Sequence, residues 1–373
     1  MSLTVTPAHD VVLARPPARR RSAFKKLAFS LVTLALLLAG AEVAVRVRDL
    51  VRFGSSTPGA QIYVTHPVLG KVPKPGAVLE GKETSIRINS LGFRSGEITA
   101  AKPAGTYRIA CLGGSTTFGL YCRDNDHTWP MMLEQKLGER YPDRTLEVIN
   151  AGVPGYTLTN SLVNLTERVL PLNPDLVIIY HAPNDLSYEQ RQVFGGDRRQ
   201  GEADGVWPVT QWLTEKSLLF RKVVKNVHVR WGSTNSPVRH DRLPDEAVER
   251  IRGRLEKLIG QCRARGIDVV VCTVATQFSA DVPAPQQRRA AGTALYYNKH
   301  LSLVGLIDAY DRINSAIRSV GRDHALALAD VARAVPGDED HFGDSVHFTN
   351  AGTGAVANCL RDTLVRSGYI SSP

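Results

Sequence analysis

From Thr106 onward, short apolar runs alternate with longer segments whose apolar residues recur at helical spacing. The runs lack the polar alternation of a strand with one face in water, which is typical of strands buried in a parallel sheet. In the segment 244–265, Val248, Ile251 and Leu255 form one stripe that would face such a sheet. We therefore predict a doubly wound, flavodoxin-like α/β fold, a five-stranded parallel sheet with helices on both faces.

The alternation also gives the expected order of elements. The predicted strands are 107–112, 146–150, 176–181, 269–274 and 325–330. The predicted helices are 129–141, 158–170, 244–265, 290–320 and 350–366. Because ligands of such sheets bind beyond the carboxyl ends of the strands, functional residues are expected in the loops that follow them.

A second feature is an almost continuously apolar segment near the N-terminus, residues 27–45, with Glu42 its only charge. At about 1.5 Å per residue, a helix of this length roughly matches a membrane core of about 30 Å. Six basic residues precede it and three follow, so the positive-inside rule places the N-terminus in the cytoplasm. Glu42 can pair with Arg46 one helical turn later. We predict one transmembrane helix or signal anchor over 27–46; a cleaved signal peptide ending near Ala39-Gly40-Ala41 and a buried core helix are the alternatives.

These features divide the chain into four parts. We predict a disordered basic cytoplasmic tail (1–26), the membrane segment, a linker or small β-rich collar (47–105) and the α/β domain (106–370). Residues 187–242 interrupt the strand–helix rhythm and carry three of the four tryptophans, which are Trp207, Trp212 and Trp231. This insertion is expected to be a helical hairpin packed on the domain, with a substrate lid or a membrane-facing helix as the alternative.

Charge and cysteine content narrow the possible partners. The formal net charge is +10, but residues 1–52 hold nine of the basic and only three of the acidic residues, so the rest of the chain is nearly balanced. A nucleic-acid-binding surface on the main domain is therefore not supported. The five cysteines form no CxxC pair, and their spacing suits no zinc site.

Reactive side chains follow the predicted strands in order. Ser115 comes after the first strand, Gly152 after the second and Asn184 after the third, while Asp344 and His347 stand just before the final helix. Acyl transfer needs a serine hydroxyl, a histidine base and a carboxylate that orients the histidine. It also needs N–H donors for the oxyanion, which the backbone of Ser115 and Gly152 and the amide of Asn184 could supply. This chemistry uses neither a metal nor an organic cofactor.

The set resembles the SGNH (GDSL-type) hydrolase superfamily, whose sequence blocks carry a Ser, a Gly, an Asn and a His in this order. The resemblance spans about 108–366 and implies Ser115 as nucleophile, Asp344 and His347 as orienter and base, and Ser115, Gly152 and Asn184 as the oxyanion hole. Two blocks depart from the usual pattern: Gly-Gly-Ser replaces Gly-Asp-Ser, and Ala-Pro-Asn-Asp replaces Gly-x-Asn-Asp. The stretch Asn-Ser-Leu-Gly-Phe-Arg at 89–94 is similar to that in membrane-anchored bacterial members.

The resemblance implies an exported, membrane-anchored serine esterase. We expect it to hydrolyse an acetyl or other short-chain ester of a glycan or lipid through a serine acyl-enzyme, with its catalytic domain on the periplasmic or extracellular side of the bacterial inner membrane. An O-acyltransferase or deacetylase that modifies envelope or secreted polysaccharide is an alternative. A third is a non-catalytic glycan-assembly protein that keeps the fold.

Overall fold

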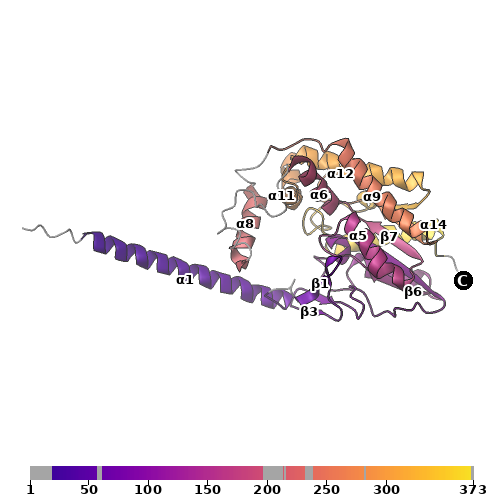
Figure 1. The fold of residues 1–373 in the computed structure, drawn as a ribbon, viewed down its shortest axis with the longest axis horizontal. Helices are drawn as coiled ribbons and strands as arrows, with labels where there is room; N and C mark the ends of the chain where they lie inside the picture. The colour runs from indigo at the N-terminus through magenta and orange to yellow at the C-terminus, as the bar shows by residue number, and fades with distance from the viewer. Residues whose placement is uncertain are drawn as a thin grey trace, which may run out of the picture.

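The protein consists of a long N-terminal helix that projects from an α/β body (Figure 1). Its structure, a computed structural model, describes residues 19–56, 61–195, 213, 216–231, 238–280 and 283–370. The predicted tail before Arg19 and the insertion residues Trp207 and Trp212 lie outside the described residues.

Helix α1 (Arg19–Phe53) begins inside the predicted tail and continues past the predicted membrane span. Its part Phe24–Phe53 is long and apolar enough to cross a membrane: its most apolar 18-residue stretch has a mean hydropathy of 2.1, and none of that stretch is buried. Leu36 is 69% exposed, so the alternative of a buried core helix is wrong. The predicted pair forms, with 2.8 Å between Arg46 Nε and Glu42 Oε1.

The body is built on a five-stranded parallel sheet, as predicted. Its strands are β5 (Thr106–Gly113), β6 (Thr145–Asn150), β7 (Leu176–Tyr180), β8 (Asp268–Cys272) and β9 (Ala327–Ala329). Their order is β6-β5-β7-β8-β9, so the chain moves outward from β5 first to one side and then to the other. Cys111 of β5 lies opposite Asn150 on one side and Ile178 on the other. The carboxyl end of β5 is therefore the switch point at which such folds bind ligands.

Two layers of helices cover the sheet. On one face α4 (Trp129–Arg140) packs with α14 (Asn350–Ser367), and on the other α5 (Leu158–Asn164), α9 (Asp245–Arg263) and α12 (Leu303–Asp323) pack side by side. All five residues of β7 are buried, as expected for a strand covered on both faces. The predicted stripe of α9 is buried too; covering a side chain such as Leu255 contributes about 1.5–3 kcal/mol.

The structure corrects two predicted helices. The single helix expected over 290–320 is three segments, α10 (Ala284–Ala290), α11 (Gly292–Tyr297) and α12. Asn298 ends α11 by donating its side-chain amide to Ala294 O (2.8 Å), and Ser302 starts α12 by accepting the N–H of Gly305 (3.1 Å). The helix expected over 158–170 is α-helical only to Asn164 and then continues as a π-helical turn, Leu165–Val169.

Before β5 the chain forms two antiparallel strand pairs rather than an extended linker. β1 (Tyr63–His66) pairs with β2 (Gly70–Pro73), and β3 (Val78–Glu80) pairs with β4 (Ser85–Arg87). These segments pack on Phe118, which follows β5, and on the loop after β6, both at the carboxyl end of the sheet. The first buried cluster is Ile62, Ala77, Leu79, Ile86, Ile88 and Phe118, and the second is Leu69, Val72, Val153 and Tyr156.

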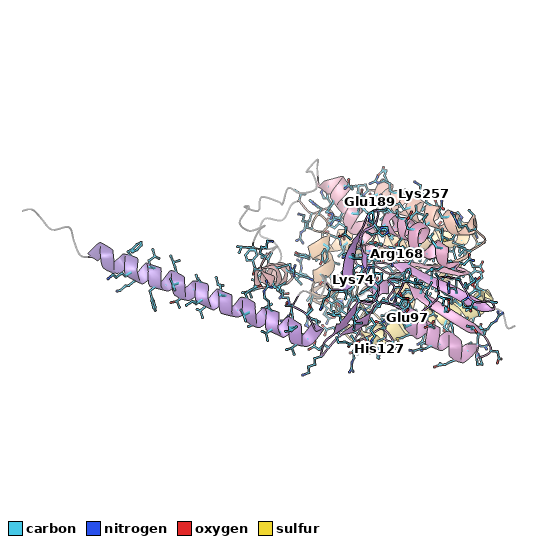
Figure 2. All side chains as sticks on the ribbon, turned by 60° about the horizontal axis from the view of Figure 1, so that its bottom comes forward. Lys74, Glu97, His127, Arg168, Glu189 and Lys257 are labelled. Carbon is cyan, nitrogen blue, oxygen red and sulfur yellow. The ribbon has the colours of Figure 1, made fainter. Side chains whose placement is uncertain are left out.

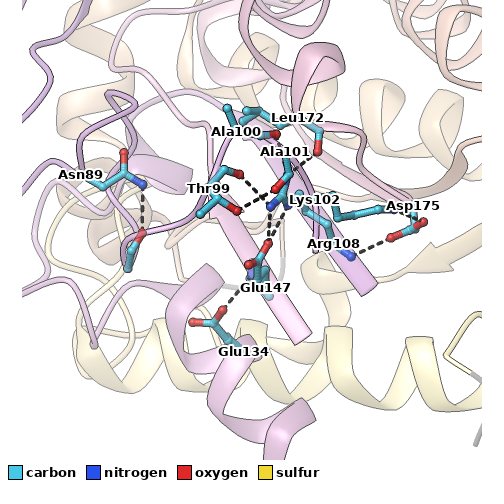
Figure 3. A network of polar contacts seen from close by, with 12 residues as sticks. Asn89, Thr99, Ala100, Ala101, Lys102, Arg108, Glu134, Glu147, Leu172 and Asp175 are labelled. Atoms are coloured by element: carbon cyan, nitrogen blue, oxygen red, sulfur yellow. Dashed lines mark hydrogen bonds and ion pairs between the residues drawn. The ribbon is translucent and has the colours of Figure 1, made fainter. Parts of the chain in front are cut away.

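A polar network fastens the chain at the opposite, amino end of the sheet (Figure 3). The fully buried Arg108 pairs with Glu147 of the neighbouring strand (2.6 Å) and donates to Thr99 O (2.9 Å). Asp175 accepts the N–H of Arg108 (2.7 Å) and pairs with Lys102 (2.6 Å). Because the buried guanidinium has both a charge partner and carbonyl acceptors, its desolvation is offset and the entry to β5 is fixed.

Candidate active site

Ser115 lies at the carboxyl end of β5, as the first residue of the short helix α3 (Ser115–Phe118). The two preceding glycines allow the turn to be this tight. A Cβ on Gly113 would lie 1.9 Å from Thr117 Oγ1, and one on Gly114 would lie 2.8 Å from Asn184 Nδ2. Gly114, the residue before the serine, therefore lies against the Asn184 amide at the switch point of the sheet.

His347 and Asp344 approach this serine from the loop before α14. Ser115 Oγ lies 2.7 Å from His347 Nε2, and His347 Nδ1 lies 2.8 Å from Asp344 Oδ1. The Asp344 carboxylate also accepts the backbone N–H groups of Val346 (3.1 Å) and His347 (3.0 Å), so it closes its own turn. The side chains of His347 and Asp344 keep 14% and 11% exposure, so a small substrate can reach them.

The surroundings of Asp344 keep it ionised. Burial alone raises the pKa of this carboxyl, but the hydrogen bond and charge of His347 and the two backbone N–H groups outweigh it and hold the pKa below its ordinary value. A carboxylate in this state fixes the imidazole with a proton on Nδ1 and leaves Nε2 free to accept the proton of Ser115.

Two of the predicted oxyanion donors already have partners. Asn184, on the first turn of α6 (Pro183–Phe194), donates one amide hydrogen to Tyr156 O (2.9 Å), which leaves its second hydrogen for a ligand. The N–H of Gly152 donates to Asn150 Oδ1 (3.1 Å), so it can serve an oxyanion only if that bond is shared or released. The N–H of Ser115 is at the amino end of α3, where such groups lack a helical acceptor.

Sequence reasoning missed Tyr121, which joins the serine loop to the histidine loop. Its hydroxyl donates to Asp344 Oδ2 (3.2 Å), and its ring centroid lies 5.3 Å from that of His347. Burial, followed by the charge of Asp344, raises the pKa of Tyr121, so the hydroxyl keeps its proton and remains a donor. This contact spans 223 residues of sequence, and no local pattern could have revealed it.

Arg94 is a second residue whose role was missed, although it ends the 89–94 stretch noted in the sequence. Its fully buried guanidinium donates to Phe118 O (3.0 Å) and Gly119 O (2.7 Å), the carbonyls that end α3. It also lies over the Phe118 ring, 5.1 Å from the centroid. Burial lowers the pKa of Arg94 to about 10, so it stays charged at neutral pH and braces the turn that holds Ser115.

A second serine–histidine–aspartate group lies in the interior. Ser161 Oγ is 2.7 Å from His181 Nε2, and His181 Nδ1 is 3.7 Å from Asp185 Oδ2. Asp185 Oδ1 accepts the N–H of Leu158 (2.9 Å), which ties the start of α5 to the start of α6. All three side chains are buried, so this group fastens α5 to the start of α6, which carries Asn184, rather than facing solvent.

A cleft of about 870 Å³ opens beside Asp344. Its lining mixes amide, hydroxyl and charged side chains with a few apolar ones, including Gln277, Gln286, Arg289, Thr293, Glu339 and Val229. Within the part of the chain that the structure describes, no three His, Cys, Asp or Glu residues are grouped to hold a metal ion.

Comparison with known proteins gives both a family and structural neighbours. The GDSL-like lipase/acylhydrolase family model matches residues 111–355, whereas no curated protein sequence matches. The chain is similar to an alpha/beta hydrolase enzyme from the metagenome of Lake Arreo, Spain, at 16% identity over 71% of this chain and 97% of that one, with a TM-score of 0.43. It is also similar to an acetylxylan esterase from Geobacillus stearothermophilus, at 14% identity over 69% of this chain and 94% of that one, with a TM-score of 0.41. A GDSL-like lipase from Bacteroides thetaiotaomicron is similar at 14% identity over 70% of this chain and 86% of that one, with a TM-score of 0.36.

The family match covers more than half of the chain and includes the loops that carry Ser115, Gly152, Asn184, Asp344 and His347. On this basis the chain belongs to the GDSL-like lipase/acylhydrolase family.

Proposed function

We propose that this protein is a serine esterase that removes an acetyl or other short acyl group from an ester, with Ser115 as its nucleophile. The observation that carries the proposal is the contact of 2.7 Å between Ser115 Oγ and His347 Nε2, with Asp344 on the other ring nitrogen. A serine placed in this way loses its proton to the imidazole as its oxygen attacks a carbonyl carbon.

The residues around Ser115 have different roles in acylation and in deacylation. As the Ser115–acyl bond forms, the oxyanion is held by the N–H of Ser115 and the second amide hydrogen of Asn184, joined by Gly152 if its bond to Asn150 opens. His347 then gives its proton to the departing alcohol, and the acyl–alcohol bond breaks. Water attacks the acyl-enzyme, His347 takes its proton, and the proton returns to Ser115 as the acid leaves.

The same proposal includes export and anchoring. Residues 27–46 of α1 cross the bacterial inner membrane once, with the N-terminus in the cytoplasm and the hydrolase domain in the periplasm. The length and composition of α1 and the excess of basic residues before it support this orientation. Protease added to intact spheroplasts should then digest the domain, and protection of the domain would overturn the orientation.

The catalytic part is tested by locating the nucleophile chemically. The full-length protein in detergent is treated with a fluorophosphonate, digested and analysed by mass spectrometry. We expect one adduct, on the peptide that contains Ser115, and its absence from the Ser115→Ala variant. An adduct on another serine, or none on protein that hydrolyses an aryl acetate, would overturn the assignment. Turnover that falls from acetyl to octanoyl esters would support the short-chain preference.

Acyl transfer to a glycan is the second candidate function. The cleft beside Asp344 supports it, because a space of about 870 Å³ with polar side chains in its lining can hold a hydroxyl-bearing acceptor next to an acyl-enzyme. Adding an oligosaccharide to the ester assay separates the two: an acylated sugar among the products favours transfer, and free acid alone favours hydrolysis.

A further inference from the structure

Helix α8 (Leu218–Trp231), from the insertion, is attached to the N-terminal helix by specific polar contacts. The Glu42 carboxylate of α1 accepts the Ser217 hydroxyl (2.8 Å) and the N–H groups of Leu218 (3.1 Å) and Leu219 (2.9 Å). It thus caps the amino end of α8, where a negative charge also suits the helix dipole. Lys222 pairs with Asp49 of α1 (2.6 Å), which makes a second contact one turn further along α8 and two turns further along α1.

The two helices cross rather than run side by side. Figure 1 shows α8 rising steeply from α1 with only its lower end beside that helix, and in Figure 2, turned by 60°, α8 is seen nearly end-on. Because Glu42 is near the outer end of the proposed membrane segment, α8 starts at the level where α1 leaves the hydrocarbon. A helix that crosses the anchor at this level lies along the membrane surface.

One face of α8 packs on the hydrolase domain. Val229 lies against α11, where a Cβ on Gly292 would be 3.1 Å from Val229 Cγ1. Lys225 lies over the Tyr297 ring, 5.9 Å from its centroid. These contacts fix the rotation of α8 about its own axis, so the direction of its opposite face is fixed as well.

The opposite face is an apolar stripe. Val223, Val224 and Val227 are 48%, 42% and 43% exposed, and Phe220 continues the stripe one turn earlier. Their i, i+3, i+4, i+7 spacing places them on one side of the helix, away from Val229. The exposed Arg221 borders the stripe, which gives α8 the combination of apolar face and basic flank typical of helices that lie in anionic lipid surfaces.

We propose that α8 is an interfacial helix, whose stripe Phe220, Val223, Val224 and Val227 is embedded in the outer surface of the membrane that α1 crosses. This inference rests on the proposed anchoring by α1. The bilayer is the occupant that fits, because Glu42 and Asp49 hold α8 against α1 at the level of the lipid headgroups. Since Val229 also lines the cleft beside Asp344, membrane contact through α8 sets the position of that cleft relative to the lipid surface.

The proposal is tested by attaching an environment-sensitive fluorophore to the stripe of the full-length protein. Four of the five free cysteines are buried, so the label is introduced as Val224→Cys in a Cys359→Ser background. The matched control is Val304→Cys, on an exposed residue at the start of α12. Both proteins are reconstituted in vesicles of phosphatidylcholine and phosphatidylglycerol.

We expect blue-shifted emission from the Val224 label, with several-fold stronger quenching by a lipid-borne nitroxide than at Val304 and weaker quenching by aqueous iodide. Equal iodide quenching at the two positions would overturn the proposal, because α8 would then face water. Shielding of the Val224 label from both quenchers would also overturn it, because protein, such as a second copy of the chain, would then cover the stripe. Alkaline carbonate extraction of the same vesicles tests the anchor separately: release of the protein means that α1 fails, whereas a retained protein with an iodide-accessible label means that only α8 fails.

Discussion

Two serine–histidine–aspartate groups occur in this chain, and the comparison between them separates chemistry from architecture. In both, a serine hydroxyl lies 2.7 Å from a histidine Nε2. Around Ser115 the second ring nitrogen is 2.8 Å from Asp344, whereas around Ser161 it is 3.7 Å from Asp185, beyond hydrogen-bond range.

The larger difference is access. Ser161 and Asp185 are fully buried and His181 is 5% exposed, so no ester can reach the interior group. The group at the carboxyl end of β5 is partly open and has Asn184 beside it as a donor. The same three residue types therefore fasten two helices together in one place and can serve an acyl transfer in the other. Position and neighbours decide which.

The largest expected effect comes from exchanging the two serines for alanine. Ser115→Ala should lower kcat on an aryl acetate by at least about 10⁴-fold, because the nucleophile is lost. Ser161→Ala should leave kcat nearly unchanged but lower the free energy of unfolding by about 1–3 kcal/mol, because the buried His181 Nε2 loses its partner. Steady-state kinetics and urea unfolding measure the two. Comparable activity losses in both variants would mean that the interior group takes part in the reaction.

The oxyanion site gives the next largest effect and tests whether donors make the difference between the two groups. Asn184→Ala should lower kcat about 10²–10³-fold with a smaller change in KM, because the amide acts mainly on the transition state. The control is Asn160→Ala in the nearby capping box of α5, which should cost about 1 kcal/mol of stability and leave kcat nearly unchanged. A loss at Asn184 confined to KM would assign this residue to substrate binding instead.

Tyr121 donates a hydrogen bond to Asp344 Oδ2, whereas Asp185 Oδ2 accepts none within the part of the chain that the structure describes. Removing the Tyr121 hydroxyl should have a smaller effect than the changes above. Tyr121→Phe keeps the ring on His347 but removes one hydrogen bond to the carboxylate, so we expect kcat to fall about two- to tenfold. Without this donor, the charge of the Asp344 carboxylate is less neutralised and favours the protonated imidazole more strongly. The acid limb of the kcat/KM profile should therefore move to higher pH. Tyr188→Phe, at a partly exposed tyrosine packed under Arg254, is the control. A lower kcat with an unmoved acid limb would limit Tyr121 to packing.

The sequence predicted the sheet well because each strand had a local signature. Strand β7 is buried on both faces, so its residues had to be uniformly apolar, and the loops after the strands carried the reactive residues. The helix break at Asn298 was missed because apolar residues recur on both sides of it, and only side-chain caps mark the interruption. Likewise, the π-helical turn after Asn164 has no distinct pattern of apolar residues.

The candidate site shows how far spacing alone can be trusted. Asp-x-x-His occurs three times, and in each the histidine Nδ1 meets the aspartate: 2.6 Å at Asp124–His127, 2.7 Å at Asp338–His341 and 2.8 Å at Asp344–His347. Only the third was predicted to be functional, because it lies directly before the final helix. The hydrogen bonds from Tyr121 to Asp344 and from Arg94 to Gly119 depend on tertiary contacts, so the sequence could not reveal them.

The smallest expected effect is a pH-dependent stability that distinguishes two of these Asp-x-x-His pairs. The folded pKa of Asp344 is below its unfolded value, so its ionised form stabilises the fold fully above the unfolded value of about 3.9, and this contribution is lost as pH falls through the folded value. The difference in unfolding free energy between the unaltered protein and Asp344→Asn should therefore shrink as the pH falls below about 4. Hydrogen bonds from His341 lower the pKa of Asp338 too, but this carboxylate is 51% exposed and solvent screens the pair, so Asp338→Asn should show a smaller change. If this difference stayed the same down to acid pH, His347 would not favour the ionised Asp344 carboxylate in the folded protein. The pairing that distinguishes the Ser115 group from the buried Ser161 group would then be lost.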